Sequence, residues 1–306
     1  KTNQTPQEVK QTNPNPQGNH LLRYRLKLQK DALLPQSDTD PNSMSSLCFL
    51  PGKTLQGAFA VKFPCLQDNQ QPPKDNAFFR RIILKGQVYF LNAYPAAHDD
   101  QDMRLVPAPH SLRKDKYQND LLHDLAENIR PDKPLQRTEN TFFKFGYKPQ
   151  SQQVATNFHY HHARAKDRRS GRALNSEYSD SGALFTYESL KAGQNFIGGL
   201  IGTSADLSLL QNYLPSGSTL SIGRSRSAQY GGGALLEWLD HSPVLYSNDI
   251  QEWNSWRACK ATGLSPDYCL IITCLSPILG INELGHPAPV FPLKQLAEIL
   301  QLGSKK

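Results

Sequence analysis

The sequence has few cysteines and no long hydrophobic run. Its 306 residues include five cysteines, an odd number with no C-x-x-C spacing, so neither a disulfide framework nor a zinc ribbon is favoured. No stretch reaches the about eighteen apolar residues of a membrane span, and no charged segment followed by an apolar one opens the chain as in a secretory signal. We therefore expect free thiols, a reducing environment and a cytoplasmic protein.

Acidic residues are outnumbered by basic ones, 27 against 34, which gives a net charge of +7. Most of this excess is local, because segment 142–174 carries seven basic residues and a single acid, Asp167. Aromatic residues lie among these cations. This combination is typical of single-stranded nucleic-acid binding, since rings stack on bases and cations neutralise phosphates. The alternative is a core strand followed by a solvated basic loop.

Short apolar segments separated by irregular polar stretches indicate an α+β fold with antiparallel sheets. Leu22, Tyr24, Leu26 and Leu28 alternate with polar residues, which predicts a half-buried strand. Further strands are expected over residues 47–50, 82–91 (a strand or a hairpin broken at Gly86), 154–162, 184–188, 196–201, 219–222 and 234–239, and an apolar run covers residues 268–275. Helices are expected over residues 53–60, 119–128, 205–213 (capped by Ser204) and 293–300.

A loop rich in glycine and arginine, residues 223–233 (GRSRSAQYGGG), lies between two of these strands. Glycines let the backbone approach a ligand and present N–H groups to phosphate oxygens. The forked donors of Arg224 and Arg226 suit phosphate, and Tyr230 offers a ring for stacking on a base. The ending of a P-loop is absent, and no helical pattern follows as in a Rossmann turn. The alternative is a flexible hairpin loop with solvated arginines.

Histidines and aspartates offer a second kind of chemistry. His159 and His161 share one face of an expected strand and His162 takes the other, and an imidazole could act as acid or base in RNA cleavage. Asp31, Asp38 and Asp40, in the loop between the first two strands, could hold a metal ion for the same reaction, although aspartates are also common turn formers. We expect no cofactor, and Mg²⁺ only if the chain is such a ribonuclease.

Several motifs resemble one family, the CRISPR-associated RAMP superfamily. LPGKTLQGAFA at residues 50–60 resembles the motif that follows the first strand of these proteins, and their middle region resembles residues 161–173, 182–188 and 196–199. The glycine-rich loop is similar to that of the Csx-type RAMP subunit of type III-D effector complexes, and VPAPHSL at 106–112 fits that subfamily.

The resemblance implies a ferredoxin-like (RRM-like) RAMP domain and a subunit that binds guide RNA (crRNA). Its partners would be guide RNA, target RNA and other CRISPR-associated subunits of a hetero-oligomeric type III ribonucleoprotein. The expected organisation is a flexible arm over residues 1–19, the RAMP domain over 20–240, a connector over 241–266 and the start of a second ferredoxin-like unit over 267–306.

The leading interpretation is a non-catalytic RNA-binding subunit. The candidate RNA-binding residues, from the basic segment and from the motifs, are Lys53, Arg164, Arg168, Arg169, Gly223, Arg224, Ser225, Arg226, Tyr230, Gly231 and Gly232. Related subunits cut target RNA with a loop aspartate, a place that Asp38 or Asp40 could take. A ribonuclease using Asp38, Asp40 or His161 is therefore one alternative, and a purely structural scaffold is another.

Overall fold

The computed structural model describes most of the chain between residues 20 and 245. The described residues are 20–36, 43–63, 65, 72–108, 112–117, 122–125, 134–137, 141–144, 150–162, 184–224, 230–245, 280–281 and 287–288. The predicted N-terminal arm, most of the predicted connector and second unit, and the helix expected near residues 293–300 lie outside this part.

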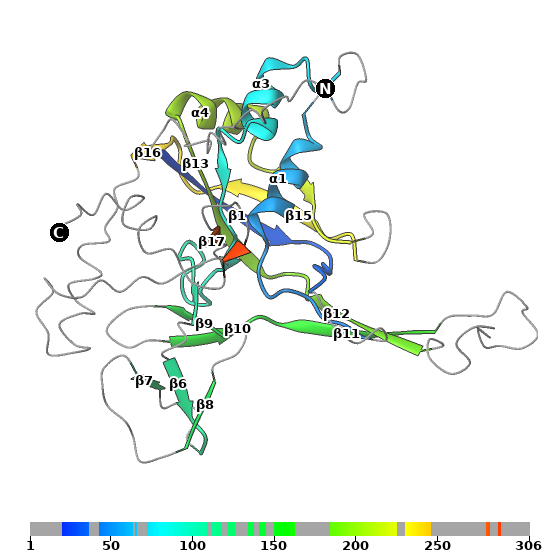
Figure 1. The fold of residues 1–306 in the computed structure, drawn as a ribbon, viewed down its shortest axis with the longest axis vertical. Helices are drawn as coiled ribbons and strands as arrows, with labels where there is room; N and C mark the ends of the chain where they lie inside the picture. Colours follow the sequence, from blue (N-terminus) through cyan, green and yellow to red (C-terminus); the bar gives the residue numbers. More distant parts are fainter. Residues whose placement is uncertain are drawn as a thin grey trace, which may run out of the picture.

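A seven-stranded antiparallel sheet forms the centre of the described structure (Figure 1). Its strands follow the order β14-β15-β1-β13-β3, with β16 paired to β1 and β4 paired to β13. The bounds are β1 His20–Leu28, β3 Tyr89–Phe90, β4 Tyr94–Pro95, β13 Asn195–Gly202, β14 Thr219–Ser221, β15 Gly233–Trp238 and β16 Val244–Leu245. The alternation predicted for β1 is confirmed, because Leu22, Tyr24, Leu26 and Leu28 are all buried.

Two helices, α1 (Gly52–Ala60) and α4 (Ser204–Tyr213), cover the apolar face of this sheet. The buried residues of β1 form one core with those of both helices, and the rings of Tyr24 in β1 and Phe59 in α1 have centroids 5.6 Å apart. Thr203 caps α4 in place of the expected Ser204, since its side chain accepts the N–H of Asp206. None of the helices in the described residues is long and apolar enough to cross a membrane.

Gly198 allows Tyr24 to enter the core. The two residues are directly paired between β13 and β1, and a Cβ on Gly198 would lie 2.5 Å from the Tyr24 ring. A side chain at this position would therefore collide with the ring. Close packing against Tyr24 thus explains the glycine at position 198 of this strand.

Three expectations about secondary structure are wrong in whole or in part. Residues 47–50 were expected to form a strand, but only Leu50 takes part in β pairing, through an isolated bridge to Ala93. Residues 82–91 were expected to be a strand or a hairpin broken at Gly86, but only Tyr89–Phe90 (β3) is a strand, and α3 (Ala77–Phe79) continues into a π-helical segment, η1 (Arg80–Leu84). The helical spacing buries both Phe79 and Ile82 against the core, and Asn76 caps the first turn. In the helix expected over residues 119–128, the described backbone instead forms strand β7 (Leu122–Asp124), because it pairs with β6.

Four smaller sheets complete the described structure. β11 (Thr156–His162) and β12 (Leu184–Leu190) form an antiparallel pair, which β2 (Ser43–Met44) extends. β5 (Val106–Pro107), β9 (Thr141–Lys144) and β10 (Gln150–Gln153) form a second sheet. β7 pairs with β6 (Leu112–Asp115), which pairs with β8 (Leu135–Arg137). β17 (Gly280–Ile281) pairs with β18 (Pro287–Ala288).

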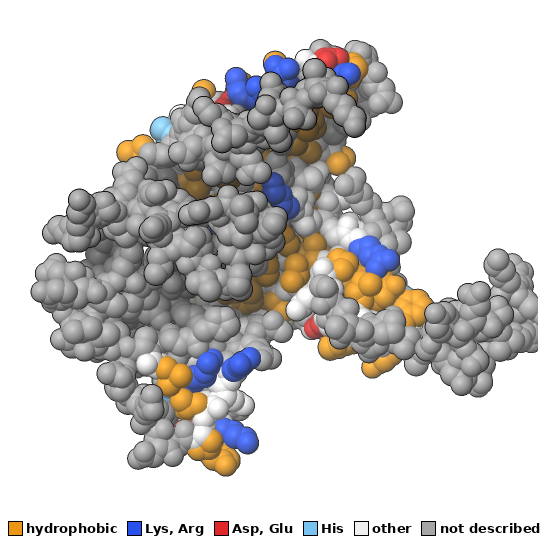
Figure 2. Space-filling view, viewed as in Figure 1, with side chains coloured by type: hydrophobic (Ala, Val, Ile, Leu, Met, Phe, Trp, Pro, Cys, Tyr) orange, Lys and Arg blue, Asp and Glu red, His pale blue; other side chains and the backbone are white. Residues whose placement is uncertain are grey.

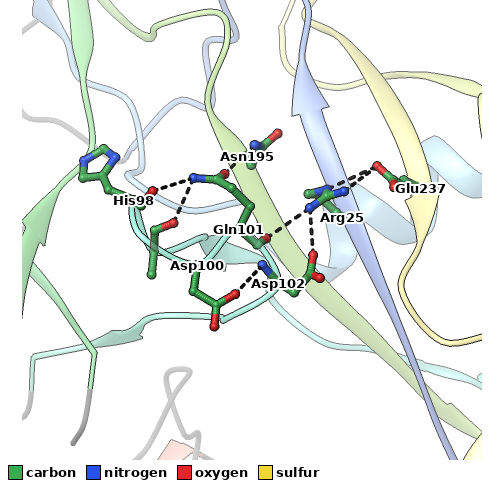
Figure 3. Close-up of polar contacts among 8 residues, drawn as sticks. Arg25, His98, Asp100, Gln101, Asp102, Asn195 and Glu237 are labelled. Carbon is green, nitrogen blue, oxygen red and sulfur yellow. Dashed lines mark hydrogen bonds and ion pairs between the residues drawn. The ribbon is translucent and has the colours of Figure 1, made fainter.

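The polar face of β1 carries arginines that the fold itself neutralises. Arg23 pairs with Asp240 at 2.7 Å, and Arg25 pairs with Glu237 at 2.7 Å and Asp102 at 2.8 Å. Figure 3 shows Arg25 between the carboxylates of β15 and of the loop after β4. These guanidinium groups already have anionic partners, so the cations available to an RNA must be sought elsewhere.

Candidate nucleic-acid interface

The β11–β12 pair presents an exposed aromatic face. Successive strand residues alternate between faces, so Phe158 and Tyr160 share one side of β11. Their side chains are 64% and 74% exposed, and they lie opposite Glu188 and Thr186 of β12. Figure 2 shows hydrophobic side chains at the surface along the part of the molecule where Figure 1 places β11 and β12. These rings belong to the basic and aromatic segment, and their exposure leaves them free to stack on bases.

The other face of the pair holds a cluster of aromatic rings around His161. Its imidazole stacks on Phe185 with centroids 5.3 Å apart and lies 4.8 Å from the ring of Tyr187. Its Nε2 is hydrogen-bonded to the hydroxyl of Tyr230. The pKa of Tyr230 is raised by burial and by the neighbouring Tyr187 and Asp31, which favours the protonated hydroxyl.

Tyr230 points into the protein, which differs from the expectation that its ring stacks on a base. Only 5% of the residue is exposed, and its ring makes edge-to-face contacts with His159, His161 and Tyr187. In this conformation the ring has no open face for a base. Tyr230 instead connects the end of the glycine-rich loop to the β11–β12 pair.

Asp31 anchors the same pair to the main sheet. Its Oδ2 accepts a hydrogen bond from Asn157 at 2.9 Å and lies 3.3 Å from Nε2 of His159, while its Oδ1 accepts the N–H of Ala192 at 2.9 Å. Nε2 of His159 also lies 3.1 Å from the hydroxyl of Ser189. Burial alone would raise the pKa of Asp31, but these hydrogen bonds and the nearby His159 outweigh it and lower the pKa.

The glycines at the two ends of the loop pack against the protein's own backbone. Gly223 has a φ of +105°, and a Cβ there would lie 2.9 Å from the carbonyl oxygen of Leu33. A Cβ on Gly232 would lie 2.7 Å from Cβ of Ala32, and Gly231 forms an isolated β-bridge with Ala32. These close approaches hold the ends of the loop to the segment after β1.

Two of the predicted RNA-binding cations are described and exposed. Arg224 follows Gly223, its N–H donates to Leu33 at 2.9 Å, and its side chain reaches the sulfur of Met44 at 3.2 Å. Lys53 lies in the first turn of α1, where its Nζ donates to Gln56 at 3.2 Å. Gly52 before it is required by packing, since a Cβ would lie 2.0 Å from the carbonyl oxygen of Phe90.

The structure thus brings part of the predicted site together. His161, Tyr230, Gly223, Gly231, Gly232 and Arg224 meet where the glycine-rich loop joins the β11–β12 pair. Lys53 lies apart from this group, on α1. The other candidates fall outside the described residues: Asp38, Asp40, Arg164, Arg168, Arg169, Ser225 and Arg226. The sequence did not single out Asn157 or Ser189. Asn157 could have been found from its alternation with His159 and His161 on one strand face.

The described residues contain no group of three or more His, Cys, Asp or Glu side chains placed to hold a metal ion. What they do provide is two exposed rings on β11, the exposed cation of Arg224 and a loop base that packs closely against the protein's own backbone. This arrangement is suited to binding a polyanion with flat bases.

Comparisons with known proteins give only distant structural similarity. No protein-family model and no curated protein sequence matches the chain. A chain of the type III-B Cmr-beta complex in its apo state has a TM-score of 0.42 at 9% identity and covers 72% of this chain and 98% of its own length. A chain of a type IV-B CRISPR complex scores 0.36 at 10% identity, covering 72% and 91%. Cmr4 (Cas7) of Pyrococcus furiosus scores 0.31 at 11% identity, covering 71% and 99%. These values assign neither a family nor a residue role to this chain.

Proposed function

We propose that this chain is a non-catalytic subunit that binds guide RNA in an RNA-guided CRISPR effector ribonucleoprotein of type III. Its partners would be the guide RNA, the target RNA and other CRISPR-associated subunits. The motifs around the glycine-rich loop favour the Csx-type RAMP subunit of type III-D within this class. One observation carries the proposal: the β11–β12 pair exposes Phe158 and Tyr160 while its other face holds the base of the glycine-rich loop.

The order of the main sheet supports a ferredoxin-like RAMP domain over residues 20–240. In that fold two β-α-β units give four antiparallel strands in the spatial order 4-1-3-2. Here β1 lies between β15 and β13, β3 flanks β13, and the helices α1 and α4 follow β1 and β13. The arm over 1–19, the connector over 241–266 and a second unit beginning in 267–306 remain parts of the same proposal.

The proposed binding mode is directed mainly at phosphates. Arg224, Ser225 and Arg226 would contact the RNA backbone from the loop, together with Lys53 and with Arg164, Arg168 and Arg169, which follow β11 in sequence. Four other candidates would hold the loop in place and would not contact an RNA base, because they pack on the protein itself. These are Gly223, Tyr230, Gly231 and Gly232. Contacts of this kind position an RNA without reading its sequence.

Salt-dependent binding tests this proposal. The full chain is titrated with a fluorescent single-stranded RNA at several KCl concentrations, and the Arg224→Gln/Arg226→Gln variant is compared with Lys74→Gln, an exposed lysine next to α3. We expect the double variant to lower the salt slope by about two units and the control to leave it unchanged. Absence of salt-dependent RNA binding by the wild-type chain would overturn the proposal.

A cleavage assay separates binding from the ribonuclease alternative. The effector complex that contains this chain and a guide RNA is incubated with RNA complementary to the guide, in the presence of Mg²⁺ or of a chelator. We expect the RNA to stay intact. Cleavage that Asp38→Ala, Asp40→Ala or His161→Ala abolishes would replace the binding role with a catalytic one. Cross-links of the basic segment to protein instead of RNA would support a scaffold.

A further inference from the structure

The small sheet β7-β6-β8 carries three basic side chains in a row. His123 of β7 lies directly opposite Arg113 of β6, and Arg113 lies directly opposite Arg137 of β8. Residues directly opposite in antiparallel strands project from the same face, with Cβ atoms about 5 Å apart. We call these three residues the basic row. None of them belongs to the glycine-rich loop or to the β11–β12 pair, and Figure 1 shows β6 well apart from that pair.

The basic row is not neutralised by the described residues. Like charges directly opposite one another destabilise a sheet, yet neither Arg113 nor Arg137 has an ion-pair partner in the described part of the chain. The guanidinium of Arg113 makes only a long contact of 3.5 Å with the carbonyl of Leu112. Nε2 of His123 is shielded from solvent and meets no hydrogen-bond partner there. Asp115, on the same strand, is buried and accepts the N–H of Tyr117 at 2.7 Å.

An exposed aromatic ring lies next to this row. Tyr117 follows β6 by two residues, and 78% of it is exposed. Its backbone is fixed, because its N–H donates to Asp115 and the N–H of Lys116 donates to the carbonyl of Pro134 at 3.0 Å. Lys116 itself is exposed. Figure 2 shows Lys and Arg side chains gathered with hydrophobic ones at the lower end of the molecule, where Figure 1 places β6 and β8.

We infer that the β7-β6-β8 sheet is a second contact site for single-stranded RNA, with the phosphodiester backbone on Arg113 and Arg137 of the basic row and a base stacked on Tyr117. Forked guanidinium donors suit phosphate oxygens, and an anion between Arg113 and Arg137 relieves their repulsion. The exposed ring beside them favours a nucleic acid over an acidic protein, since stacking needs a flat base. This inference rests on the proposed function only for the class of partner, RNA.

The test uses the full chain and a single-stranded oligouridylate containing 5-iodouridine, with binding measured against KCl concentration and photo-cross-links mapped by mass spectrometry. We expect a cross-link at Tyr117. Tyr117→Ala should weaken binding about tenfold, whereas Tyr117→Phe, which keeps the ring, should bind as the wild type does. Arg113→Gln/Arg137→Gln should lower the salt slope by about two units. Lys85→Gln, an exposed cation at the end of η1, is the matched control and should change neither quantity.

The outcomes separate this inference from the proposed function. Cross-links confined to the glycine-rich loop and the β11–β12 pair, with unchanged affinity and slope in both test variants, would overturn the inference and leave the proposed function standing. A cross-link at Tyr117, with none at the glycine-rich loop or the β11–β12 pair, would support the inference and overturn the RNA-binding mode given under the proposed function. Competition by poly-L-glutamate as effective as that by RNA would overturn the assignment to RNA. The Arg113→Gln/Arg137→Gln variant should have the melting temperature of the wild type or a higher one, because it removes the repulsion between two like charges. A loss of RNA binding in this variant can then not be attributed to unfolding.

Discussion

Oδ2 of Asp31 lies 3.3 Å from Nε2 of His159, a residue 128 positions later in the chain. The same carboxylate accepts hydrogen bonds from Asn157 and from the N–H of Ala192. One side chain in the loop after β1 therefore holds β11 and the turn between β12 and β13. The position of the exposed aromatic face relative to the main sheet depends on this carboxylate.

Asp31→Asn should destabilise the protein by about 1–3 kcal/mol at pH 7, because a charged hydrogen-bond acceptor is lost. The pKa of Asp31 is lowered from its usual 3.8 in the folded state. The stability that it contributes is therefore present above about pH 4 and lost as the pH falls through the lowered value. Urea unfolding at pH 7 and pH 3 checks this, with the exposed Asp75→Asn as control. A difference between wild type and Asp31→Asn that stays the same at both pH values would contradict the prediction.

Gly198→Ala should destabilise the fold by about 1–3 kcal/mol through overpacking against Tyr24. Gly57→Ala is the matched control, because this glycine lies in α1 and a Cβ there meets nothing within 4 Å. Replacing a helical glycine by alanine should stabilise by up to about 1 kcal/mol. Thermal unfolding followed by circular dichroism should move the two melting temperatures in opposite directions. Equal shifts of the two melting temperatures would show that the contact with Tyr24 does not determine the loss of stability in Gly198→Ala.

Phe158→Ala and Tyr160→Ala should each weaken binding of single-stranded RNA by about 1–3 kcal/mol, since each removes a ring that can stack on a base. Both side chains are largely exposed, so the free energy of unfolding should change little. Fluorescence anisotropy with an oligouridylate measures the affinity. Leu209→Ala, an exposed apolar residue on α4, serves as the control. Unchanged affinity in both aromatic variants would remove this face from the interface.

Tyr230→Phe distinguishes a ring that holds the loop from one that stacks on RNA. The substitution keeps the buried ring and removes the hydrogen bond to His161, so stability should fall by about 1 kcal/mol. RNA affinity should stay close to that of the wild type. Tyr230→Ala should lower the melting temperature further, because it leaves a cavity among His159, His161 and Tyr187. A loss of affinity in the Phe variant without a loss of stability would point to a direct contact of the hydroxyl with RNA.

The parts of the fold that the sequence predicted are those with a local signal. β1 was found from its period of two, α1 from the Pro51-Gly52 turn before it, α4 from the capping residue before it and Pro215 after it, and β13 and β15 from short apolar runs. The η1 segment was missed because isoleucines in a short run fit a strand or a helix, and the burial of Phe79 and Ile82 decided between them. β7 was missed because its pairing with β6 outweighs the helical spacing of its leucines.

In the candidate site, too, features with a local sequence signal could be predicted, and features that depend on contacts between distant residues could not. The exposed rings of β11 follow from alternation, which is local. The bond between His161 and Tyr230 joins residues 69 positions apart, and no spacing rule relates them. The inward direction of Tyr230 and the close approach of Gly232 to Ala32 involve residues far apart in the sequence, which only the folded chain brings together.

The central place of β1 affects how the protein is made on the ribosome. This strand is synthesised before the other described strands, and both of its main neighbours, β13 and β15, come from the later part of the described chain. At about 5–20 residues per second, its apolar face waits on the order of ten seconds before a partner emerges. During that time β1 exposes its unpaired backbone and four side chains that are buried in the folded protein, so it can pair with a wrong strand. We expect folding to be slow and dependent on chaperones, although the finished sheet is antiparallel throughout.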